Sequence, residues 1–240
     1  MPDKKVYRRE CLLGALGAFL MLVGDLCLSI IAPNNEDSGL FARVSYLSGQ
    51  YESWRFPLLI VTGLLGMALG VFWVRTLARQ VLPQYKKTRR LLTLGGVLCI
   101  ASAAAIHVLI GSFADWTSTL GPILGAEKTM ALISEQFSRI LSALFPGYFG
   151  LVLVIVVDFW AVLTRRTILP RKMALCHMLV FQLLFAGIPD LRQALGCDVS
   201  TWDYVLSQGS GNAALLIWML ENAVWASGKS DGCGEIANSP

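Results

Sequence analysis

The sequence predicts an all-α protein that crosses a lipid membrane several times. Only 15% of its 240 residues are charged and 55% are hydrophobic, whereas soluble domains carry about 25% charged residues. The apolar residues are concentrated in blocks of about 18 to 22 residues, a helical length that spans the ~30 Å hydrocarbon core. In lipid, a helix satisfies its own backbone hydrogen bonds. These observations exclude an ordinary soluble domain.

Six apolar blocks predict one bundle of six transmembrane helices over residues 1–226, followed by a flexible cytoplasmic tail at 227–240. The spans are expected at 11–32, 57–74, 91–112, 147–164, 173–191 and 207–226. The first block follows a basic segment, as the core of a signal peptide does. However, it is longer than such a core, contains Asp25 and has no small-residue cleavage site before Pro33. We therefore expect a retained signal anchor.

The basic residues indicate how the spans are oriented. With these boundaries, fifteen of the twenty lysines and arginines fall on the side of the N-terminus. Lysine and arginine beside span ends favour the cytoplasmic side, so both termini are expected in the cytoplasm. The net charge of +4 then reflects insertion and some attraction to anionic lipid, and it requires no nucleic-acid partner. The basic residues expected on the other side are Arg43, Arg55, Lys128, Arg139 and Arg192.

The stretch between the third and fourth spans predicts an additional amphipathic helix at 129–145. Apolar residues recur there at helical spacing, while Glu135 and Arg139 lie on the opposite face. Joined to the fourth span, this helix would reach about 54 Å, which is too long for one crossing. Pro146 and Gly147 are expected to break it. The helix would then lie at the outer interface, cap the bundle or form a re-entrant segment.

The sequence contains no motif that indicates a metal or a cofactor. The six cysteines show no CxxC pair and no metal-ligand spacing, and neither phosphate-binding nor hydrolase motifs occur. Gly14 and Gly17 in the first span, and Gly63, Gly66 and Gly70 in the second, predict close helix packing, because small residues let helices approach in lipid.

Polar residues inside the spans predict a pocket in the outer half of the bundle. Each is costly in lipid, so each is expected to face the interior, a partner or water. Arg55 is expected to pair with Asp25. A carboxylate, an imidazole and an amide in one pocket would suit acid–base chemistry on a lipid-borne substrate, whereas the alternative is a network that only pins helices together. The catalytic candidates are Asp25, His107 and Asp190, and the substrate-binding candidates are Arg55, Trp54, Asn212, Ser210 and Glu135.

A second polar layer is predicted in the inner half, formed by Asp158, His177, Glu221 and Asn222. Glu221 is expected to meet Asp158 or His177 across the bundle. Such a relay would suit proton-coupled transport. Alternatively, Glu221 and Asp158 lie close enough to the span ends to reach water. The nearby tryptophans are expected to be packing or interface anchors.

Four short motifs carry a resemblance to a known family. They are GAFLMLVGDL at 17–26, Ser53-Trp54-Arg55, His107 and Ser210-Gly211-Asn212. Together they resemble an uncharacterised family of bacterial six-helix membrane proteins, which implies a bacterial inner-membrane location and lends no reaction. Lysoplasmalogenase-type membrane enzymes also carry a Gly-Asp in a helix bundle, a fold-level analogy only, and this sequence lacks their further acidic positions.

Three classes of function follow from the sequence. One is an intramembrane enzyme that acts on a lipid or isoprenoid-like substrate, with membrane lipid and lipid-like small molecules as its partners. Another is a small transporter or channel that uses both polar layers as a path, although no inverted repeat is evident. The third is a structural or accessory membrane protein.

Overall fold

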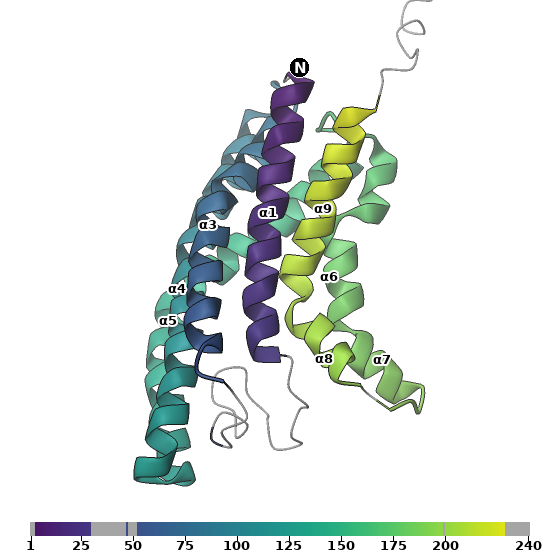
Figure 1. The fold of residues 1–240 in the computed structure, drawn as a ribbon. Coiled ribbons are helices and arrows are strands. Elements are labelled where there is room, and N and C mark those ends of the chain that lie inside the picture. The colour runs from purple at the N-terminus through teal and green to yellow at the C-terminus, as the bar shows by residue number, and fades with distance from the viewer. Residues whose placement is uncertain (1–2, 30–46, 48–51, 199, 229–240) are drawn as a thin grey trace, which may run out of the picture.

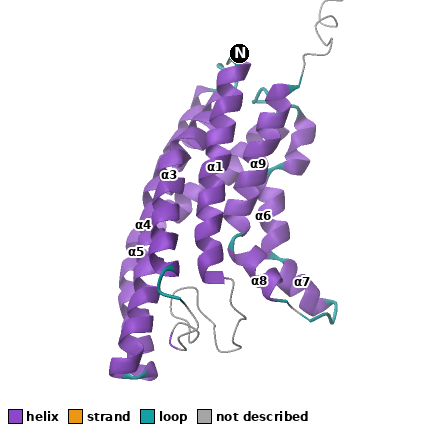
Figure 2. Ribbon diagram, viewed as in Figure 1, coloured by secondary structure: helices purple, strands orange, loops and turns teal. Residues whose placement is uncertain are grey.

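The computed structural model describes residues 3–29, 47, 52–198 and 200–228, and this part of the chain is largely helical (Figures 1 and 2). No strand is drawn among these residues; the loops at 81 and 167 form an isolated bridge. The all-α prediction is therefore confirmed. The helices are α1 Lys4–Ser29, α3 Arg55–Gln80, α4 Lys86–Leu124, α5 Ala126–Leu163, the 3-10 helix η1 Arg171–Cys176, α6 Met178–Ala186, α7 Ile188–Ala194, α8 Thr201–Gln208 and α9 Ser210–Ser227.

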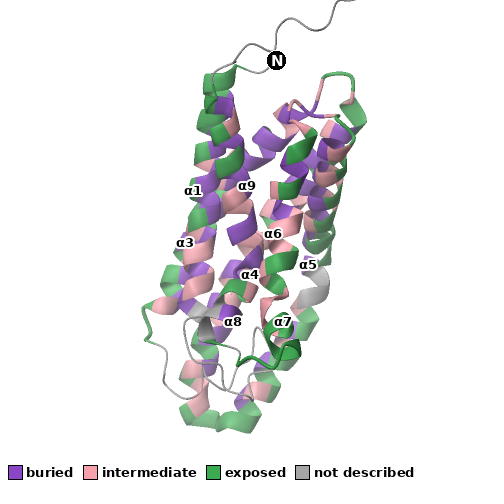
Figure 3. Ribbon diagram, turned by 90° about the vertical axis from the view of Figure 1, so that its right-hand side faces the viewer, coloured by how far each residue is buried: buried purple, intermediate pink, exposed green. Residues whose placement is uncertain are grey.

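The helices pack side by side in the order α5, α4, α3, α1, α9 and α6, and η1 and α6 contact α5 to close the ring. The beginning of α1 and the end of α9 lie at the same end of the bundle, which we call the N-terminal end (Figure 1). Exposed residues cover the outward faces of the helices, and buried residues gather between them (Figure 3). Many outward residues are large and apolar, as expected of a surface that faces lipid.

Four helical stretches are long and apolar enough to cross a membrane, and a bent pair raises the number to five. The four lie in α1, α3, α4 and the second half of α5. The fifth joins the stretch 171–186 to α7 with a bend of 48° at Gly187, and Pro189 lies in the first turn of the new helix. The sixth predicted span coincides with α9, whose 18 residues are not among these stretches. The membrane class is therefore supported, and the number six remains a prediction.

The predicted break at Pro146 is wrong, because this proline lies inside α5, one continuous helix of 38 residues. The predicted helix 129–145 is therefore the first half of α5, neither separate nor re-entrant. It runs antiparallel beside the second half of α4, and both project beyond the other helices (Figure 1). Close packing on α4 holds α5 together past the proline: the Cβ position of Gly150 lies 2.7 Å from the Gly95 carbonyl oxygen. Helices packed in this way tolerate proline.

Glycines bring α1 and α3 equally close. A Cβ atom at Gly66 would lie 2.7 Å from the carbonyl oxygen of Gly17, and a Cβ at Gly17 would lie 2.8 Å from that of Gly66. Gly14 packs in the same manner on Trp73. The predicted role of these glycines in close helix packing is confirmed.

Candidate functional site

A central cavity of about 260 Å³ lies within the ring of helices, and each α-helix described above except α7 contributes to its wall. Most of the wall is apolar, as at Met21, Met67, Ile155 and Leu215. Polar side chains interrupt it at a few positions. A mostly apolar pocket with a few convergent polar groups is the usual form of a small-molecule site.

The central cavity brings together two predicted residues from opposite ends of the chain. The Asn212 side chain on α9 donates a hydrogen bond from Nδ2 to Oδ2 of Asp25 on α1, over 2.7 Å. Gly24 fixes the position of Asp25, because α1 is pressed there against Leu59 and Thr62 of α3. The amide thus orients a carboxylate at the cavity wall, and both residues line the cavity.

His107 on α4 lines the same cavity and is buried. Its ring packs directly on Gly63 of α3, which has no side chain to occupy that space. One turn further along α4, Gly111 packs on Ile60. Nδ1 of His107 has no hydrogen-bond partner among the described residues. A buried polar atom without a partner is costly, and here it belongs to a side chain at a cavity.

Other polar residues of the cavity wall were not predicted as site residues. Trp73 is buried, and its Nε1 also lacks a partner in the described part of the chain. Gln182 is an amide inside a predicted span, so the criterion that identified Asn212 would have identified it as well. The unpredicted polar residues that line the cavity are Trp73, Tyr148, Gln182 and Gln208.

Arg55 is the first residue of α3 and lies beside the end of α1. Its Nη1 donates to the carbonyl oxygen of Cys27 over 3.5 Å, and its Nε pairs with Glu52 at 3.4 Å. Its guanidinium carbon also lies 5.6 Å from the ring centroid of Trp54, which is exposed. The pairing of Arg55 with Asp25 stays a prediction.

Three other candidates lie away from the described wall of the central cavity. Asp190 is exposed in the first turn of α7. Glu135 is exposed on the projecting half of α5 and forms an ion pair with Arg139. Ser210 is buried at the first position of α9. None of them is among the described residues of the cavity wall.

The inner polar layer forms a network centred on Asp158 of α5, which is fully buried. Its carboxylate accepts hydrogen bonds from Nε2 of Gln80, from Nε2 of His177 over 3.1 Å and from Nε1 of Trp218 over 3.2 Å. Nδ1 of His177 accepts the backbone N–H of Leu179 over 3.0 Å. Nε2 is therefore the protonated nitrogen that donates to Asp158.

The network continues to α1 and α9. The Tyr7 hydroxyl donates to Oδ1 of Asn222 over 2.8 Å and approaches Oε1 of Gln80 at 3.3 Å. Nδ2 of Asn222 donates to the carbonyl oxygen of Trp218 over 2.8 Å. Tyr7 and Gln80 were missed because the predicted spans began at 11 and ended at 74, whereas α1 and α3 extend further.

Glu221 does not take the predicted place beside Asp158 or His177. It is exposed, whereas its neighbour Asn222 is buried within the network. Successive residues of a helix point about 100° apart, so only one of the two faces inward. The buried donor from α9 is Trp218, one helical turn earlier.

A family model matches residues 1–203, which is most of the chain. The chain belongs to a family of unknown function, DUF6796. The predicted membership of an uncharacterised family is thereby confirmed. No curated protein and no solved structure matches the chain. The DUF6796 match contains Asp25, His107, Asp158 and His177, and ends before α9, which supplies Asn212 and Trp218.

This DUF6796 protein thus has two polar centres of different character. In the inner network, the carboxylate of Asp158 has three donors, and none of its residues lines the described cavity wall. At the central cavity, a carboxylate has an amide donor and a nearby imidazole has an unpartnered nitrogen. Among the described residues of these two centres, the unpartnered Nδ1 of His107 is the atom that offers hydrogen-bonding capacity to a small molecule in the cavity.

Proposed function

We propose that this membrane protein binds an amphipathic, lipid-like molecule in the central cavity. One observation carries the proposal: the Asp25–Asn212 pair and His107, with its unpartnered Nδ1, line a single cavity whose walls are otherwise mostly apolar. The polar residues would bind the polar end of the ligand. The apolar wall would bind its hydrocarbon part, whose burial supplies most of the binding free energy.

Asp25 and His107 are the residues with acid–base capacity at this site. A carboxylate held by an amide can accept a proton, and an imidazole can donate or accept one. The ligand we propose is a lipid or an isoprenoid-like molecule. Since the cavity of about 260 Å³ is smaller than the ~300–1,000 Å³ of typical ligand pockets, it would hold only the polar end and an adjoining segment.

The geometry favours this function over a transporter or channel that uses both polar layers. A path would have to pass from the central cavity through the inner layer. There, Asp158, His177 and Asn222 are fully buried. His177 is hydrogen-bonded to Asp158, and Asn222 is hydrogen-bonded to the carbonyl oxygen of Trp218. Such packing suits a lock between helices rather than a route for ions or solutes.

The location that we propose is a bacterial inner membrane, with six spans and both termini in the cytoplasm. The resemblance supports the bacterial source, and the distribution of basic residues supports the orientation. The bundle is consistent with an even number of crossings, because the beginning of α1 and the end of α9 share one end of it (Figure 1).

Native mass spectrometry of the full chain, released from detergent micelles after purification from a bacterial membrane, tests the binding. We expect the wild type to retain a lipid-like adduct that Asp25→Asn and His107→Ala lose while their unfolding temperatures stay close to that of the wild type. Asp190→Asn, which removes the same charge from an exposed position, is the control and should keep the adduct. If both cavity variants keep the adduct, or both fail to fold, Asp25 and His107 serve the bundle rather than a ligand.

A further inference from the structure

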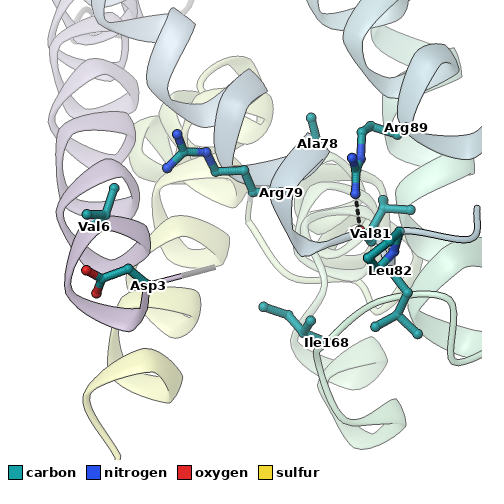
Figure 4. A pocket seen from close by; sticks show the side chains of 9 residues that line it. Asp3, Val6, Ala78, Arg79, Val81, Leu82, Arg89 and Ile168 are labelled. Carbon is teal, nitrogen blue, oxygen red and sulfur yellow. Dashed lines mark hydrogen bonds between the residues drawn. The ribbon is translucent and has the colours of Figure 1, made fainter. Parts of the chain in front are cut away.

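A second cavity, of about 460 Å³, opens at the N-terminal end of the bundle (Figure 4). We call it the N-terminal cavity. It lies between the first turn of α1, the end of α3, the loop that leads into α4 and the loop that follows α5. It shares no described wall residue with the central cavity. The wall residues that matter below are Asp3, Val6, Arg79, Leu82, Arg89 and Ile168.

Arg89 presents a fixed cation with spare hydrogen-bonding capacity. Its Nη2 donates to the backbone carbonyl oxygen of Val81 over 2.9 Å, the dashed line in Figure 4, and this bond fixes the guanidinium group. Its Nε is buried and has no hydrogen-bond partner within the described residues. Because a guanidinium group stays charged, a buried N–H without an acceptor is costly. Arg89 thus brings a fixed positive charge to the cavity wall, where it attracts an anionic group.

Arg79 adds positive charge on the other side of the cavity. Its Nη1 lies 2.9 Å from Oε2 of Glu10, whose other oxygen pairs with Arg75 at 3.0 Å. One carboxylate thus serves two arginines. Asp3, the acidic residue in the described part of the wall, accepts the backbone N–H of Lys5 over 2.8 Å and caps α1. Among the described wall residues, two arginines thus outnumber one aspartate, and α4 begins there with no acidic residue in its first turn.

The wall of the N-terminal cavity is rigid and partly apolar. The two loops are joined by backbone hydrogen bonds from Leu82 N–H to the Arg166 carbonyl oxygen, over 2.8 Å, and from Ile168 N–H to that of Gln80, over 2.7 Å. Val6, Leu82 and Ile168 add apolar surface to the wall around the two arginines (Figure 4). Such a wall suits the carbon atoms of a molecule whose charged group contacts the guanidinium groups.

We propose that the N-terminal cavity binds a phosphate group, carried either by a phospholipid headgroup or by a free phosphate compound. Guanidinium groups match the oxygens of phosphate in geometry and charge, and these hydrogen bonds are stronger than neutral ones. The guanidinium group of Arg89 donates to a phosphate oxygen, and Arg79 lies across the cavity as a second cation. This site is separate from the central cavity, and its occupancy does not depend on the function proposed there.

The test measures binding of three probes to the full chain in a neutral detergent by native mass spectrometry and thermal unfolding. The probes are phosphatidylglycerol, a diacylglycerol with the same chains, and inorganic phosphate at millimolar concentration. Arg89→Gln is compared with Arg90→Gln, which removes the same charge from the next, exposed residue of α4 outside the described cavity wall. Leu82→Trp fills the cavity without changing charge and replaces Arg89→Gln if that variant does not fold.

We expect phosphatidylglycerol to bind and diacylglycerol not to bind. Arg89→Gln or Leu82→Trp should weaken phosphatidylglycerol binding by about tenfold or more, and Arg90→Gln should leave it nearly unchanged. Stabilisation by inorganic phosphate that competes with the lipid identifies a free phosphate compound as a ligand, whereas its absence identifies the headgroup. Equal losses in Arg89→Gln and Arg90→Gln would show unspecific charge attraction, and equal binding of diacylglycerol would show a merely apolar groove; either result overturns the proposal.

Discussion

At the scale of single residues, Asp158 connects most of the bundle. Its carboxylate accepts hydrogen bonds from side chains of α3, of α9 and of His177, the residue that precedes α6. Through Asn222 the network reaches Tyr7 on α1. A buried carboxylate is costly unless hydrogen bonds compensate its lost hydration. Here His177 also caps α6, because its Nδ1 accepts the backbone N–H of Leu179. The network therefore fixes both the spacing of the helices and the start of α6.

Replacing Asp158 by asparagine should destabilise the protein. The amide keeps one acceptor oxygen and turns an NH₂ group toward one of the three donors, so a buried donor loses its partner, at a cost of about 1–3 kcal/mol. Denaturant unfolding in detergent measures this. Glu221→Gln, the same change at an exposed position, should stay within about 0.5 kcal/mol of the wild type. Equal effects of the two substitutions would contradict the assigned network.

From the surroundings of Asp203, in the first turn of α8, we predict that its carboxylate contributes to stability in a pH-dependent way. The backbone N–H and the hydroxyl of Ser200 both donate to it over 2.7 Å, and Arg192 lies 3.2 Å away. These hydrogen bonds, and then the arginine, hold the pKa of Asp203 below its ordinary value. The stabilisation is therefore complete above the unfolded pKa of about 3.9 and is lost as the pH falls through the lower folded pKa.

Comparison with Asp203→Asn tests this contribution. The unfolding temperature of the wild type should exceed that of the variant near neutral pH, because only the carboxylate gains from Ser200 and Arg192. The difference should shrink as the pH falls below about 3.9. A difference that persists unchanged in acid would mean that the ionised form is not the stabilising one.

At the scale of helices, glycine contacts decide which elements are neighbours. The crossings of α1 with α3 at Gly17 and Gly66, and of α4 with α5 at Gly95 and Gly150, bring backbone against backbone. In lipid, helices gain no hydrophobic free energy by meeting, so close van der Waals packing must hold them together. The same packing explains why α5 continues through Pro146 beside α4.

Gly66→Ala should weaken the contact between α1 and α3. Its Cβ would lie 2.6 Å from Cγ of Met21 and 2.7 Å from the Gly17 carbonyl oxygen. The backbones must separate, at a cost of about 1–3 kcal/mol. Gly211→Ala is the matched control in another helix, where the nearest atom is 3.9 Å away. There alanine should be neutral or stabilise by about 0.5–1 kcal/mol, so a loss of stability at both sites would refute the packing argument.

At the scale of the whole molecule, the distribution of charge and the arrangement of the helices agree. The N-terminal end of the bundle carries the start of α1, the basic beginning of α4 and the end of α9 (Figure 1). The opposite end carries α7, α8 and the turn between α4 and α5 (Figure 1). The positive-inside rule then predicts that the N-terminal end faces the cytoplasm.

Cysteine labelling on intact bacterial cells tests this orientation. Cys197 is exposed in the turn after α7, at the end opposite the N-terminus. With Cys197 as the single cysteine, a membrane-impermeant maleimide should label it from outside. In a cysteine-free chain, Lys4→Cys should react only after the cells are permeabilised. The reverse pattern would invert the orientation.

Part of the candidate site could be predicted from the sequence. Asp25, His107 and Asn212 were identified because polar groups inside apolar blocks must find partners, and all three line the central cavity. Asp190 satisfied the same depth criterion, and Glu135 was a candidate on the amphipathic helix 129–145, but both are exposed. Depth along a helix specifies a level in the membrane, whereas rotation about the helix axis decides whether a side chain faces the cavity or the surroundings.

The sequence by itself determined the membrane class and the helical architecture, because the length and polarity of an apolar block act locally on each segment. Only the tertiary structure decided that Asn212 is hydrogen-bonded to Asp25, 187 residues away. It also decided that Tyr7 and Gln80 join the network of Asp158, and that α5 continues without a break past Pro146. These outcomes depend on how helices rotate and approach one another. That choice is made by side-chain packing and glycine contacts between segments distant in sequence.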